Sequence, residues 1–97
     1  MQIRLEDRRP AATEMLTVST TAVSLTESKY STKTIQAQIT VEDGPLRYRT
    51  DGLPPTASVG HRADDGSTIL LIGYTEISNF QVVCGGTDGA IVVTYYV

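Results

Sequence analysis

Four Asp-Gly pairs divide the chain into short apolar runs, and this punctuation restricts the folds open to it. The pairs are Asp43-Gly44, Asp51-Gly52, Asp65-Gly66 and Asp88-Gly89. Glycine accepts a positive φ at little cost, so each pair is a turn signal. No segment shows sustained helical periodicity, whereas Thr, Val and Ile are plentiful. Short apolar runs between such turns predict an all-β fold, an antiparallel sandwich or barrel.

The clearest strand is predicted over residues 34–42, where polar and apolar residues alternate. Its inward face comprises Ile35, Ala37, Ile39 and Val41, and its outward face Thr34, Gln36, Gln38, Thr40 and Glu42. The run Thr68 to Ile72 is apolar without alternation, which predicts a strand covered on both faces. Further strands are expected over 76–84, with Phe80, Val82 and Cys84 inward, and over 90–97, with Ile91, Val93, Tyr95 and Val97 on one face.

Residues 14–25 are strand-like, but the parity of their apolar positions changes. Leu16 and Val18 share one face, while Val23 and Leu25 share the other, on either side of Thr20-Thr21. This shift indicates a bulge or a strand that crosses between two sheets. We therefore predict a single jelly-roll-like antiparallel β-sandwich of about seven strands over 14–97, preceded by an N-terminal arm over 1–13. The arm carries Ile3 and Leu5, and it either frays or adds a strand to a neighbouring subunit.

The stretch from Gly44 to His61 combines a short strand, a turn and a loop stiffened by Pro54-Pro55. Arg47 and Arg49 share one face of the strand, where they can pair with local acids or bind a partner. A stiff loop beside two arginines is typical of a binding surface. We therefore take Arg47, Arg49, Pro54 and Pro55 as candidate protein-interface residues.

Composition narrows the class of partner. The chain has 97 residues, a formal charge of −3 and a single cysteine, which indicates one domain without an internal disulfide. The chain has no run of Lys and Arg residues, so nucleic-acid binding is not predicted. The longest apolar stretch, 69–72, is far too short for a membrane span, and the first ten residues lack the apolar core of a signal peptide. These features suit a protein made and kept in cytoplasm.

The sequence contains no recognisable catalytic or cofactor-binding motif. His61 is predicted to lie in a loop and Cys84 in the core, so they are not expected to form a nucleophilic pair. A zinc site is not expected either, because the chain has only these two His and Cys residues. Glu42 and Glu76 are the candidates for a glycosidase pair, but nothing in the sequence fixes the distance between their carboxylates. Calcium binding by the acidic residues near the turns is the one metal site that the sequence leaves as an alternative. These residues are Asp43, Asp51, Asp64, Asp65 and Asp88. We predict neither an enzyme nor a cofactor.

Three tyrosines are better indicators of function. Tyr74, Tyr95 and Tyr96 lie near strand ends, and tyrosine is enriched at protein interfaces. The competing use is stacking against a sugar, although the chain lacks tryptophan. All three are candidate interface residues.

The second half of the chain resembles small all-β virion proteins of tailed bacteriophages. The resemblance covers about residues 35–97 and depends on three features: the arginine-rich strand Leu46-Arg47-Tyr48-Arg49-Thr50, the turn Asp51-Gly52-Leu53-Pro54-Pro55-Thr56, and the closing Val93-Thr94-Tyr95-Tyr96. Gly60, Gly66, Ile72-Gly73, Ile77 and Phe80 also fit the pattern. Residues 1–34 fall outside it.

This resemblance implies a structural role on a phage particle, and it brings no catalytic residues. The expected function is capsid decoration, in which a cement protein binds and stabilises the head shell. A head–tail or tail adaptor is the first alternative, and a carbohydrate-binding β-sandwich is the second. The expected partners are further copies of the chain, as a symmetric oligomer with a trimer favoured, and a major capsid or neck protein. The expected location is the virion, assembled in the host cytoplasm.

Overall fold

The structure is a computed structural model that describes residues 9–97. It consists mostly of strands, with a single α-helix within that range. The elements in chain order are β1 (Pro10–Val18), β2 (Val23–Ser24), a 3₁₀ turn (Glu27–Lys29), β3 (Gln36–Asp43), β4 (Leu46–Arg49), β5 (His61–Ala63), β6 (Thr68–Ile72), α1 (Gly73–Asn79), β7 (Gln81–Cys84) and β8 (Gly89–Tyr96).

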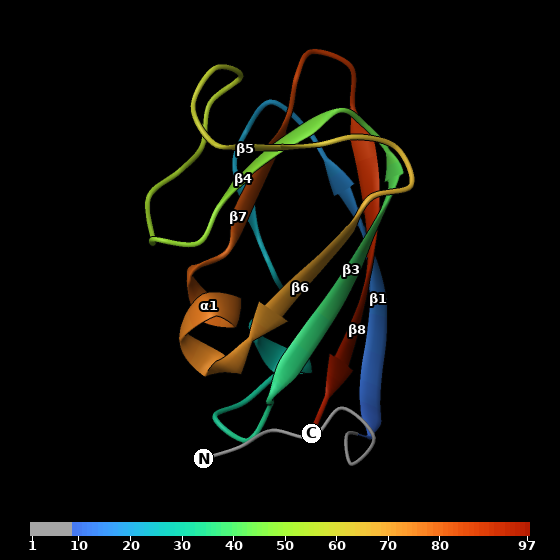
Figure 1. The fold of residues 1–97 in the computed structure, drawn as a ribbon, viewed down its shortest axis with the longest axis vertical. Helices are drawn as coiled ribbons and strands as arrows, with labels where there is room; N and C mark the ends of the chain where they lie inside the picture. The colour runs from blue at the N-terminus through green and yellow to red at the C-terminus, as the bar shows by residue number, and fades with distance from the viewer. Residues whose placement is uncertain (1–8) are drawn as a thin grey trace.

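The strands form two antiparallel sheets of four strands each (Figure 1). Sheet A has the order β1-β8-β3-β6, and sheet B has the order β2-β7-β4-β5. The helix α1 follows β6 directly and lies beside it at one end of the molecule (Figure 1). The long strands β1, β3 and β8 all belong to sheet A, so this sheet provides the largest regular surface.

The strand pairs show how the chain winds. β1 pairs with β8, β2 with β7, β3 with β6, and β4 with β5, so the first half of the chain runs back along the second half as a long antiparallel ribbon. Two further pairs, β3 with β8 and β4 with β7, close this ribbon on itself. Successive strand pairs along the ribbon therefore alternate between the sheets, with β1–β8 and β3–β6 in sheet A and β2–β7 and β4–β5 in sheet B.

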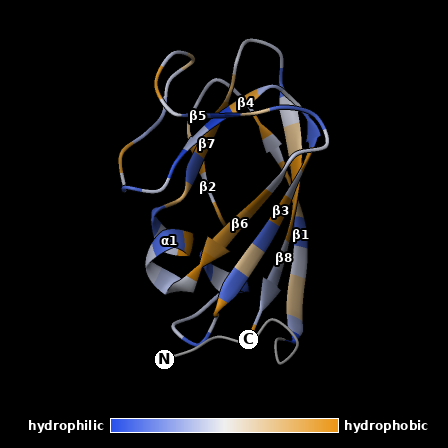
Figure 2. Ribbon diagram, viewed as in Figure 1, coloured by the Kyte–Doolittle hydropathy of each residue, from blue (hydrophilic) through white to orange (hydrophobic). Residues whose placement is uncertain are grey.

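One hydrophobic core lies between the inward faces of the two sheets. The strands alternate as their pattern requires: β8 places Ile91, Val93 and Tyr95 inside with less than 1% exposure, and β3 does the same with Ala37 and Ile39. Sheet B adds Leu46, Val82 and Cys84, and α1 adds Ile77, its single buried residue. Figure 2 shows the resulting alternation of hydropathy along β3.

Several predictions of the sequence are confirmed. The fold is all-β in character, and Phe80, Val82 and Cys84 are buried. The change of parity near Thr20 marks a crossing between sheets, because β1 belongs to sheet A and β2 to sheet B. Asp51-Gly52 turns the chain as expected, with Gly52 at φ +84° and the Asp51 side chain accepting the Leu53 N–H.

Other predictions are wrong. Residues 76–79 belong to α1 and not to a strand. β6 is covered on one face only, because Leu70 and Ile72 are 50% and 43% exposed. Thr34 and Gln36, both predicted to face solvent, are buried, although the register keeps Gln36 on the outer face of sheet A with Tyr96 and Ile72. His61 lies in β5 and not in a loop. The strands number eight because β2 and β5, of two and three residues, are too short to leave an apolar pattern.

Part of the segment that the sequence assigns to the N-terminal arm lies in a strand. β1 begins at Pro10 and pairs with β8, so residues 10–13 are part of sheet A. Ile3 and Leu5, the two apolar residues of the arm, lie outside the described residues.

Candidate interaction surface

The outer face of sheet A is the most distinctive surface of the described chain. It runs across all four strands and carries Thr13, Met15 and Thr17 from β1, Ala90, Val92, Thr94 and Tyr96 from β8, Gln38 and Thr40 from β3, and Thr68, Leu70 and Ile72 from β6. None of these residues is charged. Among the described residues, acidic side chains border this face at Glu42 and Asp43, where β3 is bulged against β8, and at Glu76 beside the edge of β6.

The register aligns these side chains in rows across the strands. One row contains Met15, Val92, Thr40 and Thr68, and the next contains Thr13, Thr94, Gln38 and Leu70. The Thr13 and Thr94 hydroxyls lie 3.3 Å apart, within hydrogen-bonding distance. The rows mix short hydroxyl side chains with apolar ones, and none of these side chains carries a charge.

Large apolar side chains on this face are strongly exposed. Met15 is 67% exposed, Leu70 50% and Ile72 43%, and Figure 2 shows β6 as an almost uninterrupted hydrophobic strand. Interface cores are depleted in charged residues and enriched in methionine and aromatic side chains. The sequence-based prediction missed this face because the apolar run of β6 was taken as buried on both sides, and because single threonines carry no signal by themselves.

The arginines of the Gly44–His61 stretch are used within the chain. Arg47 Nη1 donates a hydrogen bond to the Gly60 carbonyl at 3.1 Å, which fixes the end of the loop against β4. Gly60 has φ +137°, and a Cβ there would lie 3.0 Å from the Tyr48 carbonyl oxygen. The loop therefore passes so close to β4 that only glycine fits without strain.

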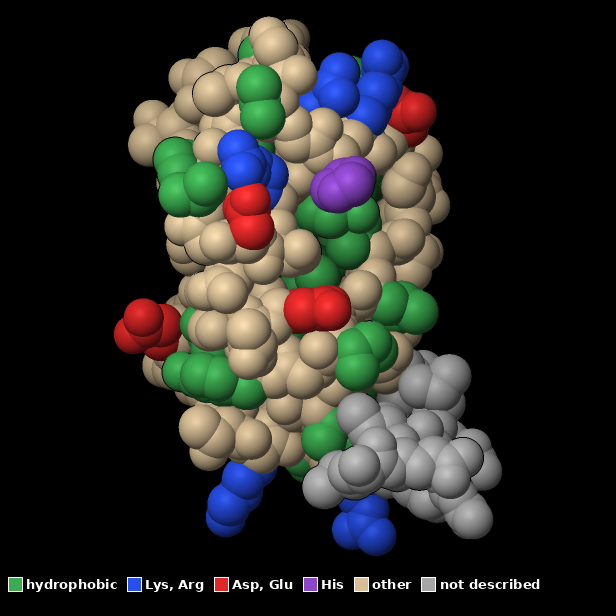
Figure 3. Space-filling model, turned by 60° about the vertical axis from the view of Figure 1, so that its left-hand side comes forward, with side chains coloured by type: hydrophobic (Ala, Val, Ile, Leu, Met, Phe, Trp, Pro, Cys, Tyr) green, Lys and Arg blue, Asp and Glu red, His purple; other side chains and the backbone are tan. Residues whose placement is uncertain are grey.

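Arg49 pairs with a local acid, as the simpler interpretation of the strand predicts. Its Nε donates to Asp51 Oδ1 at 3.0 Å, and its Nη2 donates to Asp51 Oδ2. The hydrogen bond from Arg49 lowers the pKa of the Asp51 carboxyl. A hollow of about 400 Å³ lies beside this pair, lined also by Thr50, Gly60 and His61. On the side of the molecule in Figure 3, acidic and basic side chains and the histidine are interspersed, in contrast to the uncharged face.

Tyr95 is not a surface residue. Its ring is completely buried in the core, and its hydroxyl donates to the Glu14 carboxylate. The same carboxylate accepts hydrogen bonds from Thr26 Oγ1 at 2.5 Å and from Thr26 N at 3.4 Å. Burial, followed by the hydrogen bond to Glu14, raises the pKa of the Tyr95 phenol. Glu14 is thus an inward-facing charge satisfied inside the fold, and Tyr95 cannot stack against a ligand.

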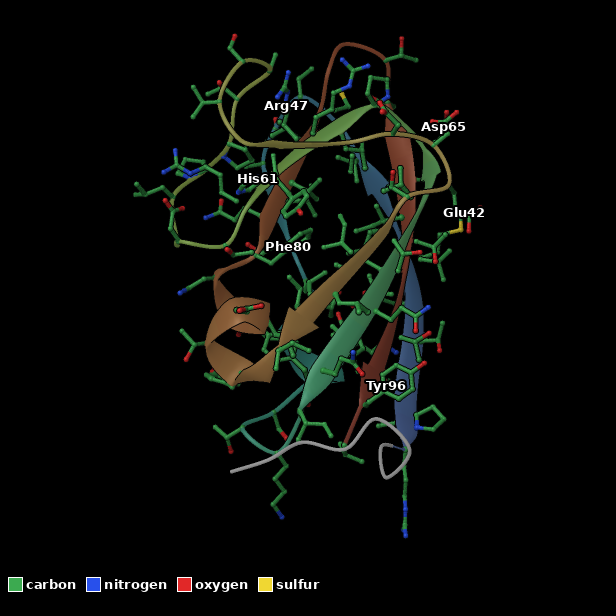
Figure 4. All side chains as sticks on the ribbon, viewed as in Figure 1. Glu42, Arg47, His61, Asp65, Phe80 and Tyr96 are labelled. Carbon is green, nitrogen blue, oxygen red and sulfur yellow. The ribbon has the colours of Figure 1, made fainter. Side chains whose placement is uncertain are left out.

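The other two tyrosines keep access to solvent. Tyr74, at the start of α1, is 44% exposed and packs against Tyr30 with ring centroids 6.0 Å apart. Tyr30 in turn stacks on Tyr95 at 5.9 Å. Tyr96 is half-buried and lies on the outer face of sheet A, with its hydroxyl 3.4 Å from Gln38 Oε1. Figure 4 shows Tyr96 near the opposite end of the molecule from Arg47 and His61.

The remaining candidates are scattered. Pro54 is exposed in the loop, whereas Pro55 is buried. His61 is exposed on β5 with its ring 5.4 Å from that of Tyr48, while the Cys84 side chain is in the core. Residues 9–97 contain no group of three or more metal-ligating side chains, the turn acids included. Within that range no helix is long and apolar enough to cross a membrane.

Comparison with known proteins yields no relative: no family model, curated protein or solved structure matches the chain.

Proposed function

We propose that the protein is a structural protein of a bacteriophage particle, most directly a decoration or cement protein that binds the head shell. The observation that carries this proposal is the outer face of sheet A, which is uncharged and bears the exposed side chains of Met15, Leu70 and Ile72. A face of this kind suits a permanent contact with another protein surface. The resemblance of residues 35–97 to phage virion proteins supports the same role.

The winding of the chain supports the proposal at the level of architecture. We propose that the fold is an eight-stranded jelly roll, since an antiparallel ribbon that closes into two four-stranded sheets has the strand order found here. Viral capsid domains use this architecture, as do lectins and cupins. Because one fold serves many functions, the uncharged face, and not the fold, is what supports a virion role.

Particle occupancy tests the proposed contact directly. We would add purified protein to particles that lack it and measure the bound amount after sedimentation. Leu70→Glu should reduce occupancy at least tenfold, because binding would bury an unpaired charge in an apolar contact. Val59→Glu is the matched control, since Val59 is 51% exposed in the loop between β4 and β5, away from this face. Equal occupancy of the two variants would refute the assignment of the face.

The first alternative, a neck or tail adaptor, would use the same face on a different partner. Copy number separates the two, because a shell contains many equivalent sites and a neck contains few.

Carbohydrate binding is the second candidate, since lectins share the proposed architecture and the Tyr74 ring is partly exposed. The burial of Tyr95 removes one of the three stacking residues that the sequence predicted. Binding on a glycan array that is lost in Tyr74→Ala would favour this candidate, and an empty array would eliminate it.

A further inference from the structure

The strand β1 is the longest free edge in the described chain. Sheet A ends in β1 and β6, and sheet B ends in β2 and β5. β1 has nine residues, against two in β2 and three in β5. The edge of β6 is partly occupied, because the Glu76 carboxylate accepts the Ile72 N–H at 3.0 Å and α1 lies beside the strand.

The hydrogen-bonding pattern shows which backbone groups of β1 point away from the sheet. Gly73 N donates to Ile35 O, and Val41 N donates to Ser67 O. The backbone N–H and C=O groups of the odd residues of β3 therefore bond to β6, and those of its even residues bond to β8. The residues of β8 opposite these even residues are also even. The backbone N–H and C=O groups of the odd residues Ile91 and Val93 therefore point toward β1.

Ile91 and Val93 are opposite Leu16 and Glu14 of β1, so these even residues of β1 bond to β8. The backbone N–H and C=O groups of the odd residues Thr13, Met15 and Thr17 therefore point outward along the free edge.

This edge lacks the usual protection against pairing. Natural edge strands are shielded by charged side chains, proline, bulges or very short length. In β1 the proline and the bulge occur only at its start, at Pro10 to Ala12. The single charge of the strand, Glu14, faces inward and is bound by Thr26 and Tyr95. Among residues 9–97 no strand pairs with the outer edge of β1 from Thr13 to Val18, and the exposed side chains there are uncharged.

The outward residues are symmetric about Met15. If two copies pair antiparallel with Met15 on a two-fold axis, Thr13 faces Thr17 of the partner subunit and Met15 faces Met15 of the partner subunit. Each such pair exchanges two backbone hydrogen bonds, roughly six in all. Thr–Thr and apolar cross-strand pairs both stabilise a sheet, and isologous contacts of this kind are the commonest basis of homodimers.

We propose that the protein forms a two-fold dimer in which β1 of one copy pairs antiparallel with β1 of a second copy, centred on Met15. The occupant of this edge is therefore another copy of the same chain, and sheet A continues across both subunits. The uncharged outer face continues with it. This inference does not depend on the proposed virion role, and it replaces the trimer expected from the sequence with a dimer.

Disulfide trapping in the full chain tests the register. Cα atoms of a hydrogen-bonded antiparallel pair are about 5.5 Å apart, within the range that a disulfide spans. Met15→Cys should therefore yield a disulfide-linked dimer as its main product under mild oxidation. The matched control is Thr17→Cys, whose two copies would be separated by about 14 Å along the strands and should stay unlinked. Cys84 is buried and common to both variants.

Mixing Thr13→Cys with Thr17→Cys provides a positive control, because these two residues face each other in the proposed register and should link. Equal cross-linking of Met15→Cys and Thr17→Cys alone would overturn the register.

Mass in solution tests the assembly independently. The wild-type chain should sediment at twice its 10.5 kDa, and Met15→Lys should sediment as a monomer, because it places like charges directly opposite each other. Leu70→Lys, on the same face but on the other edge strand, should stay dimeric. Far-ultraviolet circular dichroism checks that each variant is folded. A wild-type monomer, a trimer, or a dimer that persists in Met15→Lys would each refute the proposal.

Discussion

Replacing Tyr95 by phenylalanine should remove one hydrogen bond from a partly buried carboxylate while the core stays filled. The Tyr95 ring has no exposed surface, and its hydroxyl donates to Glu14. Hydrogen bonds to charged groups contribute about 1.5–3 kcal/mol to the free energy of unfolding. Glu14 keeps its contact with Thr26 Oγ1 at 2.5 Å, so the carboxylate remains partly satisfied and the loss should lie within that range.

The assay is urea denaturation followed by circular dichroism, with thermal unfolding as a second readout. For a domain of this size, 1 kcal/mol shifts the melting temperature by about 4 °C, so Tyr95→Phe should lower it by roughly 6–12 °C. In a Glu14→Gln background the acceptor is neutral, and the same substitution should cost only about 0.5–1.5 kcal/mol. A cost that is unchanged in that background, or a loss below about 0.5 kcal/mol in the wild type, would refute the role of the charged acceptor.

Two further predictions concern the same fold. Because burial raises the pKa of the Tyr95 phenol, the folded state favours the protonated form; this contribution is complete below about pH 10, the ordinary tyrosine pKa, and is lost as the pH rises above it. Urea denaturation at increasing pH should show wild-type stability falling more steeply above that value than the stability of Tyr95→Phe, and parallel curves would contradict the assignment. Gly60→Ala should destabilise by roughly 1–3 kcal/mol, because it combines φ +137° with a Cβ 3.0 Å from the Tyr48 carbonyl. Gly66→Ala is the control, with φ +79° and nothing within 4 Å of its Cβ, and an equal cost for both would show that the close approach to Tyr48 is unimportant.

The strands with strict alternation could be predicted from the sequence because one face of each is core. Ala37, Ile39 and Val41 in β3, and Ile91 and Val93 in β8, are buried as their period of two requires. The crossing near Thr20 could also be predicted, since a change of sheet reverses which parity faces the core. Local pattern and tertiary burial agree in these segments.

The failures arise where local pattern and tertiary position disagree. Leu70 and Ile72 are as apolar as Ile69 and Leu71, and only the position of β6 at the edge of sheet A leaves them exposed. The helix α1 has seven residues and one buried side chain, too few for a helical period to be visible.

The candidate surface was missed for the same reason. Its residues come from strands far apart in the sequence, and their lack of charge becomes apparent only when the register aligns them. The predicted site residues Arg47, Arg49 and Tyr95 are instead bound within the chain. Isolated polar and aromatic residues in a sequence do not reveal whether their partners are internal.

The most direct test of the proposed virion role is the number of copies per particle. Particles from the natural source of the protein would be purified on a gradient. Quantitative peptide mass spectrometry then gives this number relative to the major shell protein. A decoration protein predicts hundreds of copies in a fixed ratio to that shell protein. A few copies per particle would assign the protein to the neck or tail. Particles that contain none would contradict the virion role altogether.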